Sequence, residues 1–110
     1  MDDRFAGGAV DRHEAHESFD PADLRVPPSR QQGADPLKLA RQIALFGDSA
    51  VGMPTPWVYE GSDEVLVLYN GVTRATRMAK LAPGTTIRVE VIGTLPKAFA
   101  SQPRIGDLLP

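Results

Sequence analysis

One turn near the middle of the chain carries residues suited to holding an anion. An apolar stretch at residues 65–69 runs into an Asn-Gly pair, and a segment with helical spacing follows. The first amides of a helix lack partners within the helix, and the helix dipole adds partial positive charge there. Gly71 leaves the backbone open to a ligand, Thr73 adds a hydroxyl, and Arg74 adds a forked cationic donor. We therefore expect phosphate or carboxylate at residues 70–74, which we call the anion turn.

Two more cations follow on the same predicted helix. Arg77 and Lys80 lie one to two helical turns beyond Arg74, so we expect them near the same side of the helix and close to the anion. The alternative is that Gly71 only makes a tight turn and that the three bases form a solvated face. The sequence alone favours neither interpretation.

Other chemistries lack the residues that they need. The chain has no Cys, which excludes disulfides and a thiol nucleophile. No His falls within the predicted domain, so its serines have no partner for a Ser–His–acid arrangement. His13 and His16 have the spacing of a helical metal pair, but the chain has no other His. We interpret them as solvated tail residues and predict no metal site.

Three aromatic residues, Trp57, Tyr59 and Tyr69, alternate around a predicted β-hairpin. If such rings are exposed, they can stack on the bases of a nucleotide or a single strand. We favour core packing instead, because a domain this small needs its aromatic side chains inside.

Charge is distributed unevenly along the 110 residues, although the net charge is only −2. Residues 1–35 hold eight acids and four Arg, whereas residues 71–110 hold six bases and two acids. An acidic segment can mask a basic surface or keep the chain soluble, and we favour solubility. The start does not resemble a secretory signal, and no apolar run approaches the roughly 18 residues of a membrane span. We expect a cytoplasmic protein with no membrane partner.

A small domain at residues 35–110 would position the anion turn. Residues 1–34 contain few large apolar side chains with no sustained period, so we predict a disordered or irregular acidic tail there. At most we expect one helical turn near residues 13–18.

Apolar periodicity and turn residues predict two helices and three strands within the domain. Asp35 and Pro36 are typical of a helix start, and Gly47 is typical of a helix end. Asn70 or Thr73 would cap the second helix. Together the elements predict a small α+β domain with a mixed sheet and two main helices. In chain order they are helix 36–46, strands 57–59 and 65–69, helix 71–81, strand 86–92 and a packed turn at 105–109.

Residues 69–82 follow a pattern found in one protein family. An apolar strand leads to Gly71, two variable residues, Arg74 and then the Ala-Lys-Leu run 79–81, with a Val-rich strand beyond. This arrangement resembles the ParB/sulfiredoxin-like superfamily, in which an acidic-Gly or Asn-Gly turn precedes an Arg at a helix N-terminus. The resemblance extends over about residues 36–110 and is most specific at the turn and its helix.

The resemblance implies a nucleotide ligand. The family's turn binds nucleotide phosphate, CTP in chromosome-partitioning proteins and ATP in sulfiredoxins and related kinases, which would put Gly71, Thr73 and Arg74 on a phosphate. The catalytic Cys of sulfiredoxin has no counterpart, and Thr73 precedes Arg74 where the partitioning proteins carry a basic pair. We identify neither a helix-turn-helix module nor a second phosphate-binding box. The resemblance therefore supports a fold and an anion site, not partitioning, peroxiredoxin repair or kinase activity.

We predict a small ParB-like domain that binds a nucleotide, a nucleic acid or another phosphate-bearing ligand at the anion turn, with no catalytic residue assigned. One alternative is a protein-interaction module that docks a protein partner through its acidic tail or its Pro-rich C-terminus. A third hypothesis is a nuclease- or toxin-like effector domain, for which the sequence holds no metal-ligand cluster. The expected roles are helix capping by Asn70, amide donation at Gly71, a hydroxyl from Thr73, phosphate clamping by Arg74 and assistance from Arg77 and Lys80.

Overall fold

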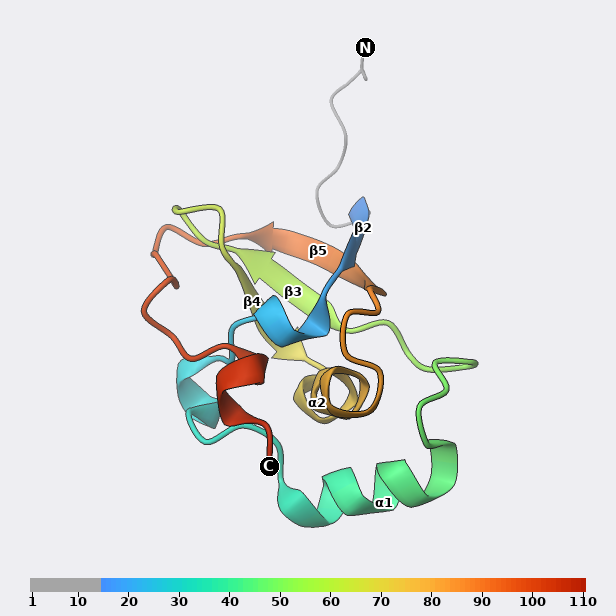
Figure 1. Cartoon of the computed structure of the whole chain (residues 1–110). Coiled ribbons are helices and arrows are strands. Elements are labelled where there is room, and N and C mark those ends of the chain that lie inside the picture. Colours follow the sequence, from blue (N-terminus) through green and yellow to red (C-terminus); the bar gives the residue numbers. More distant parts are fainter. Residues whose placement is uncertain (1–14) are drawn as a thin grey trace.

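A four-stranded mixed sheet forms one layer of the protein, and two helices lie on one side of it (Figure 1). The computed structural model describes residues 15–110. The spatial order across the sheet is β2 (Ala15–Phe19), β5 (Ile87–Thr94), β3 (Trp57–Glu60) and β4 (Leu66–Asn70). Strands β2 and β5 pair antiparallel, as do β3 and β4, whereas β3 and β5 run parallel. The predicted α+β class, with a small mixed sheet and two main helices, is confirmed.

Both predicted helices form. Helix α1 (Pro36–Phe46) begins at Asp35, whose carboxylate accepts hydrogen bonds from two backbone amides of the first turn at 2.8 and 3.3 Å. Gly47 ends this helix with φ +56°, as predicted. Helix α2 (Val72–Leu81) packs under the sheet, and α1 packs on α2 (Figure 1). No helix within residues 15–110 has both the length and the apolar character needed to cross a bilayer.

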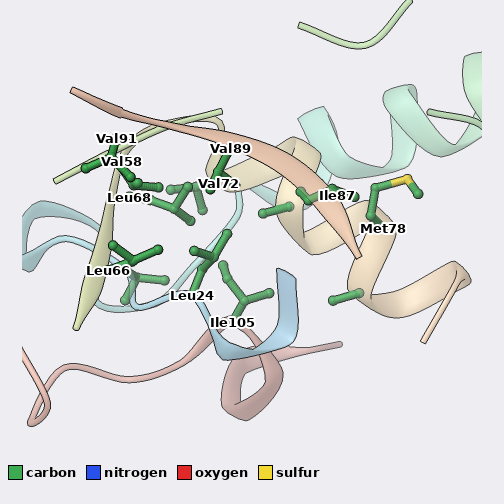
Figure 2. Close-up of a cluster of buried hydrophobic side chains, with 13 residues drawn as sticks. Leu24, Val58, Leu66, Leu68, Val72, Met78, Ile87, Val89, Val91 and Ile105 are labelled. Carbon is green, nitrogen blue, oxygen red and sulfur yellow. The ribbon is translucent and has the colours of Figure 1, made fainter. Parts of the chain in front are cut away.

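One apolar cluster joins the sheet to α2 (Figure 2). In the first part of β5 every second residue is buried, as the alternating sequence predicts for a strand with one covered face. Leu24 and Ile105, which are far apart in the sequence, meet in this cluster: both are fully buried, and Ile105 N donates to Leu24 O at 2.8 Å. Ile105 begins the 3₁₀ turn Ile105–Leu108, so the predicted packed turn near the C-terminus is confirmed.

Strand β2 corrects part of the predicted irregular tail. The sequence indicates at most a helical turn near residues 13–18, but residues 15–19 are extended and pair antiparallel with β5. The cause is non-local, because β5 offers unpaired backbone groups at its outer edge and no pattern within the tail reveals them. Residues 1–14, with His13 and part of the acidic tail, lie outside the described residues.

A second segment of the predicted tail belongs to the core. Leu24 and Val26 are fully buried, and Arg25 between them pairs with β4. The amide of Arg25 donates to Leu66 O at 3.1 Å, and its carbonyl accepts from Leu68 N at 2.9 Å. Two apolar residues around one polar residue are too short a pattern to indicate a strand. The folded domain therefore starts well before the predicted boundary.

The aromatic residues correct the prediction of core packing. In β3 the side chain of Val58 is fully buried, so its neighbours Trp57 and Tyr59 point to the opposite face of the sheet. Trp57 is 43% exposed and Tyr69 is 61% exposed, while Tyr59 is half-buried. Both helices lie on the inner side of the sheet (Figure 1), so neither covers these rings. Aliphatic side chains fill the core instead.

Asp63, in the turn between β3 and β4, ties the hairpin to the loop after β5. Its carboxylate accepts hydrogen bonds from the amides of Ala100 at 2.9 Å, Phe99 at 3.0 Å and Val65 at 3.3 Å. Partial desolvation acts to raise the pKa of Asp63, but these hydrogen bonds favour the charged form and hold its pKa below the ordinary value of 3.8.

We expect Asp63→Asn to lower the melting temperature at neutral pH. Both carboxylate oxygens of Asp63 accept hydrogen bonds from backbone amides, whereas the side-chain amide of Asn has only one oxygen that can accept them. A lowered pKa contributes stability above the pKa of the unfolded state, and this contribution is lost as the pH falls through the folded-state pKa. The difference in melting temperature from wild type should therefore be largest near neutral pH and shrink below about pH 4. Glu64→Gln removes a charge from the same turn and serves as the control. Identical pH profiles for the two variants would contradict this account of Asp63.

Candidate functional site

The anion turn forms as a sharp strand-to-helix junction. β4 ends at Asn70, Gly71 turns the chain with φ +108°, and α2 begins at Val72. Within the described part of the chain, no side chain caps α2, and its first backbone bond runs from Ala75 N to Gly71 O at 2.9 Å. The amides of the first helical turn are therefore without a side-chain acceptor.

Asn70 does not cap α2, which corrects the predicted role of this residue. It is the last residue of β4 and pairs with Trp57 of β3. Gly71 occupies the N-cap position, so Asn70 lies one residue too early to cap, and Thr73 lies within the helix. The side-chain oxygen of Asn70 instead accepts a hydrogen bond from Arg74 Nη2 at 3.2 Å. This contact holds the guanidinium of Arg74 across the turn.

The fold itself requires Gly71. A Cβ at this position would lie 2.8 Å from the Cβ of Pro56 and 3.1 Å from Arg74 Nη2. Protein atoms, rather than open space for a ligand, therefore lie where the side chain would be. The positive φ and the close approach of Pro56 explain this glycine without a ligand.

The cleft in front of the anion turn brings together cations from three separate segments. The cations are Arg74 of α2, Lys38 of α1 and Arg30 of the 3₁₀ turn Pro28–Arg30. The neutral residue Thr73 of α2 also lines the cleft. None of the described residues that line the cleft is acidic. Its volume of about 290 Å³ is at the lower limit of ligand pockets. We refer to this region as the cationic cleft.

Pairing beside β4 brings Arg30 to the cleft. Arg25 pairs in parallel with Val67, so the chain after Arg25 runs beside the end of β4 and reaches the anion turn. Lys38 projects from the first turn of α1, which packs on α2. Neither residue was identified from the sequence, because Arg30 falls in the predicted tail and Lys38 lies far upstream of the turn. In the sequence, Lys38 is only a base near the start of a predicted helix, and this pattern is too common to indicate a binding site.

Arg74 is desolvated without a countercharge. Burial lowers the pKa of its guanidinium from the ordinary value, and its Nε is buried with no hydrogen-bond partner. The salt bridges among residues 15–110 do not include Arg74, and the contact with Asn70 is to a neutral amide. An anion in the cationic cleft would offset this desolvation.

Arg77 and Lys80 do not lie in the cationic cleft. Arg77 is 1% exposed, and its Nη1 donates to Gly47 O at 2.7 Å and to Ser49 O at 2.8 Å. Lys80 Nζ donates to the backbone oxygen of Pro110 at 3.1 Å. Each step of three residues turns a helix about 60° away from the starting direction. Two such steps carry Lys80 to a different side of α2 from the anion turn.

A second recess, of about 260 Å³, adjoins the cationic cleft and shares Gln42 and Arg74 with it. Its rim carries the apolar side chains of Phe46, Val51 and Met53. We refer to it as the apolar recess. A ligand with an apolar part next to its charged group could extend from the cleft into this recess.

The chain was compared with known proteins, and no protein-family model, curated protein or solved structure matches it. Within residues 15–110, no group of three or more His, Cys, Asp or Glu side chains is arranged to hold a metal ion.

Proposed function

We propose that this protein is a ParB-like domain whose cationic cleft binds the phosphate groups of a nucleotide or a nucleic acid. The observation that carries this proposal is the convergence of Arg30, Lys38 and Arg74 on the uncapped start of α2, with no acid among the described residues of the cleft lining. Helix N-termini and forked cationic donors are the groups with which proteins bind phosphate. The resemblance to the ParB/sulfiredoxin-like superfamily supports the same site, because it places Arg74 on a phosphate.

Phosphate suits the cationic cleft better than carboxylate does. A phosphate monoester carries about two negative charges and three strongly accepting oxygens at neutral pH, whereas a carboxylate carries one charge. Three cations from separate segments can contact different oxygens of one phosphate or of two adjacent phosphates. The proposal concerns binding, and it assigns no reaction to the cleft.

Titration calorimetry with inorganic triphosphate, CTP and ATP tests the proposed function. We expect binding at millimolar or lower ligand concentrations, weakening as salt is added because the attraction is electrostatic. Arg74→Ala should reduce affinity by about tenfold, since a hydrogen bond to a charged group contributes about 1.5–3 kcal/mol. In NMR spectra, the backbone amides of residues 72–74 should shift most.

Two residues of α1 provide a matched control for this titration. Lys38 lines the cationic cleft, whereas Arg41 is exposed on the same helix and does not line it. We expect Lys38→Ala to weaken triphosphate binding severalfold and Arg41→Ala to leave it unchanged. Absence of binding at millimolar ligand, or equal affinities for wild type, Arg74→Ala and Lys38→Ala, would overturn the proposal.

A further inference from the structure

We infer that the cationic cleft binds the phosphates of a single-stranded nucleic acid. The bases of this strand stack on Trp57 and Tyr69, on the sheet face opposite the helices and beside the cleft. This inference rests on the proposed phosphate site. It extends that site from an anion to a strand, and it assigns a role to the two exposed rings.

Trp57 and Tyr69 form an exposed pair of rings, which we call the ring pair. Their planes lie within 7° of parallel, with centroids 6.5 Å apart, and Tyr59 meets Tyr69 edge-on at 5.6 Å. Large aromatic side chains usually lie mostly buried, so two rings exposed by 43% and 61% on one sheet face call for an explanation. Exposed rings on a sheet are a means by which proteins stack the bases of single strands.

Irregular pairing of β3 shapes this cluster of rings. The register with β4 shifts between Trp57 and Val58, and the register with β5 shifts between Val58 and Tyr59. Such bulges re-aim side chains and increase the local twist. Gly93 of β5 leaves room for Tyr59, because a Cβ there would lie 3.2 Å from the ring of Tyr59. The rings are therefore held by the sheet itself rather than by a mobile loop.

Tyr69 connects the ring pair to the cationic cleft. It lines the cleft together with Arg30 and Arg74, and its ring is the partner of Trp57. In a nucleic acid strand each base is attached beside a phosphate, so a binding surface must offer cations and rings next to one another. Tyr69 meets this requirement, because it belongs both to the ring pair and to the lining of the cationic cleft.

The shape of the site favours a strand over a single nucleotide. A pocket for a small ligand usually encloses about 70–90% of the ligand surface. Here the cleft measures only about 290 Å³. The rings of Trp57 and Tyr69 are exposed, and both helices lie on one side of the sheet (Figure 1). Stacking contacts on an open surface are individually modest and add up over several bases.

The fluorescence of Trp57 provides a direct test, because it is the only Trp in the chain. We expect a single-stranded oligonucleotide of about eight nucleotides to quench this fluorescence on binding. An abasic strand of the same length loses stacking on both rings, so it should bind at least about 30-fold more weakly and leave the fluorescence unchanged. This comparison uses the unmodified full chain, so it does not depend on whether a variant folds.

Two single substitutions locate the bases. Measured by calorimetry, Trp57→Ala should weaken oligonucleotide binding about tenfold. It should leave inorganic triphosphate binding within a factor of about two, because Trp57 does not line the cationic cleft. Phe46→Ala is the matched control, since it removes another exposed ring, at the apolar recess rather than at the ring pair. It should leave the affinity for the oligonucleotide unchanged.

The possible outcomes separate this inference from the proposed function. If triphosphate binds through Arg74 but the normal and abasic strands bind equally, the inference fails and the proposed function stands. If binding of the bases needs Phe46 and not Trp57, the bases lie in the apolar recess and the inference also fails. If concentration alone changes Trp57 fluorescence and sedimentation shows a dimer, a second copy covers the rings, which overturns the inference. Failure of every phosphate ligand to bind overturns both.

Discussion

Arg77→Ala is expected to lower the free energy of unfolding by about 3 kcal/mol, although the substituted residue is a charged one. The guanidinium is buried under the loop after α1 and donates to the carbonyls of Gly47 and Ser49 at 2.7 and 2.8 Å. Its Cζ lies 5.4 Å from the centroid of the Phe46 ring. Alanine would leave both carbonyls unpaired and open a void between α2 and the loop.

Chemical denaturation and thermal melting measure this effect, and we expect the melting temperature to fall by about 15 °C. Lys80→Ala is the control on the same helix, because Lys80 is exposed and its Nζ donates to the backbone oxygen of Pro110. That variant should stay within about 0.5 kcal/mol of wild type. Below its melting temperature, Arg77→Ala should still bind triphosphate. An unchanged stability together with lost binding would mean that Arg77 contacts the ligand, as the sequence suggested.

Gly71→Ala should also cost about 3 kcal/mol of stability, for two separate reasons. The backbone φ of +108° is unfavourable for any residue with a Cβ. The new methyl group would also lie 2.8 Å from the Cβ of Pro56, which is itself buried and cannot move away easily. The junction between β4 and α2 would have to shift to relieve this contact.

Gly84→Ala separates these two costs. Gly84 has a comparable φ of +83°, but no atom lies within 4 Å of the position where its Cβ would be. We expect this variant to lose only about 1 kcal/mol, which is the conformational part. Denaturation of both variants under the same conditions gives the difference that is due to Pro56. Equal losses at the two positions would contradict the packing role of Gly71.

These expectations divide the residues in and around the anion turn by role. Gly71 and Arg77 hold the fold together, so their substitution should act on stability first. Arg74 and Lys38 line the cleft with exposed or half-buried cations, so their substitution should act on phosphate binding. The sequence could not make this division, because glycine and arginine suit both roles.

The sequence predicts the strand-to-helix junction that borders the cationic cleft, but it does not predict the distant residues that complete the cleft lining. An apolar strand, an Asn-Gly pair and a helix with Arg74 are adjacent in the chain, so their geometry follows from local rules. Arg30 and Lys38 reach the same cleft only because Arg25 pairs with β4 and α1 packs on α2. Such contacts have no signature in a single sequence.

The elements that can be predicted from the sequence are those whose signals are local. The cap at Asp35, the end at Gly47 and the apolar periods each act within a few residues, so two helices and the central strands follow from them. The face that each side chain occupies depends instead on tertiary contacts. A sheet face is buried or exposed according to where the helices pack, and a helical residue turns about 100° from its neighbour. For this reason Trp57 and Tyr69 lie outside, Arg77 lies inside, and the anion turn opens onto a cleft that distant cations complete.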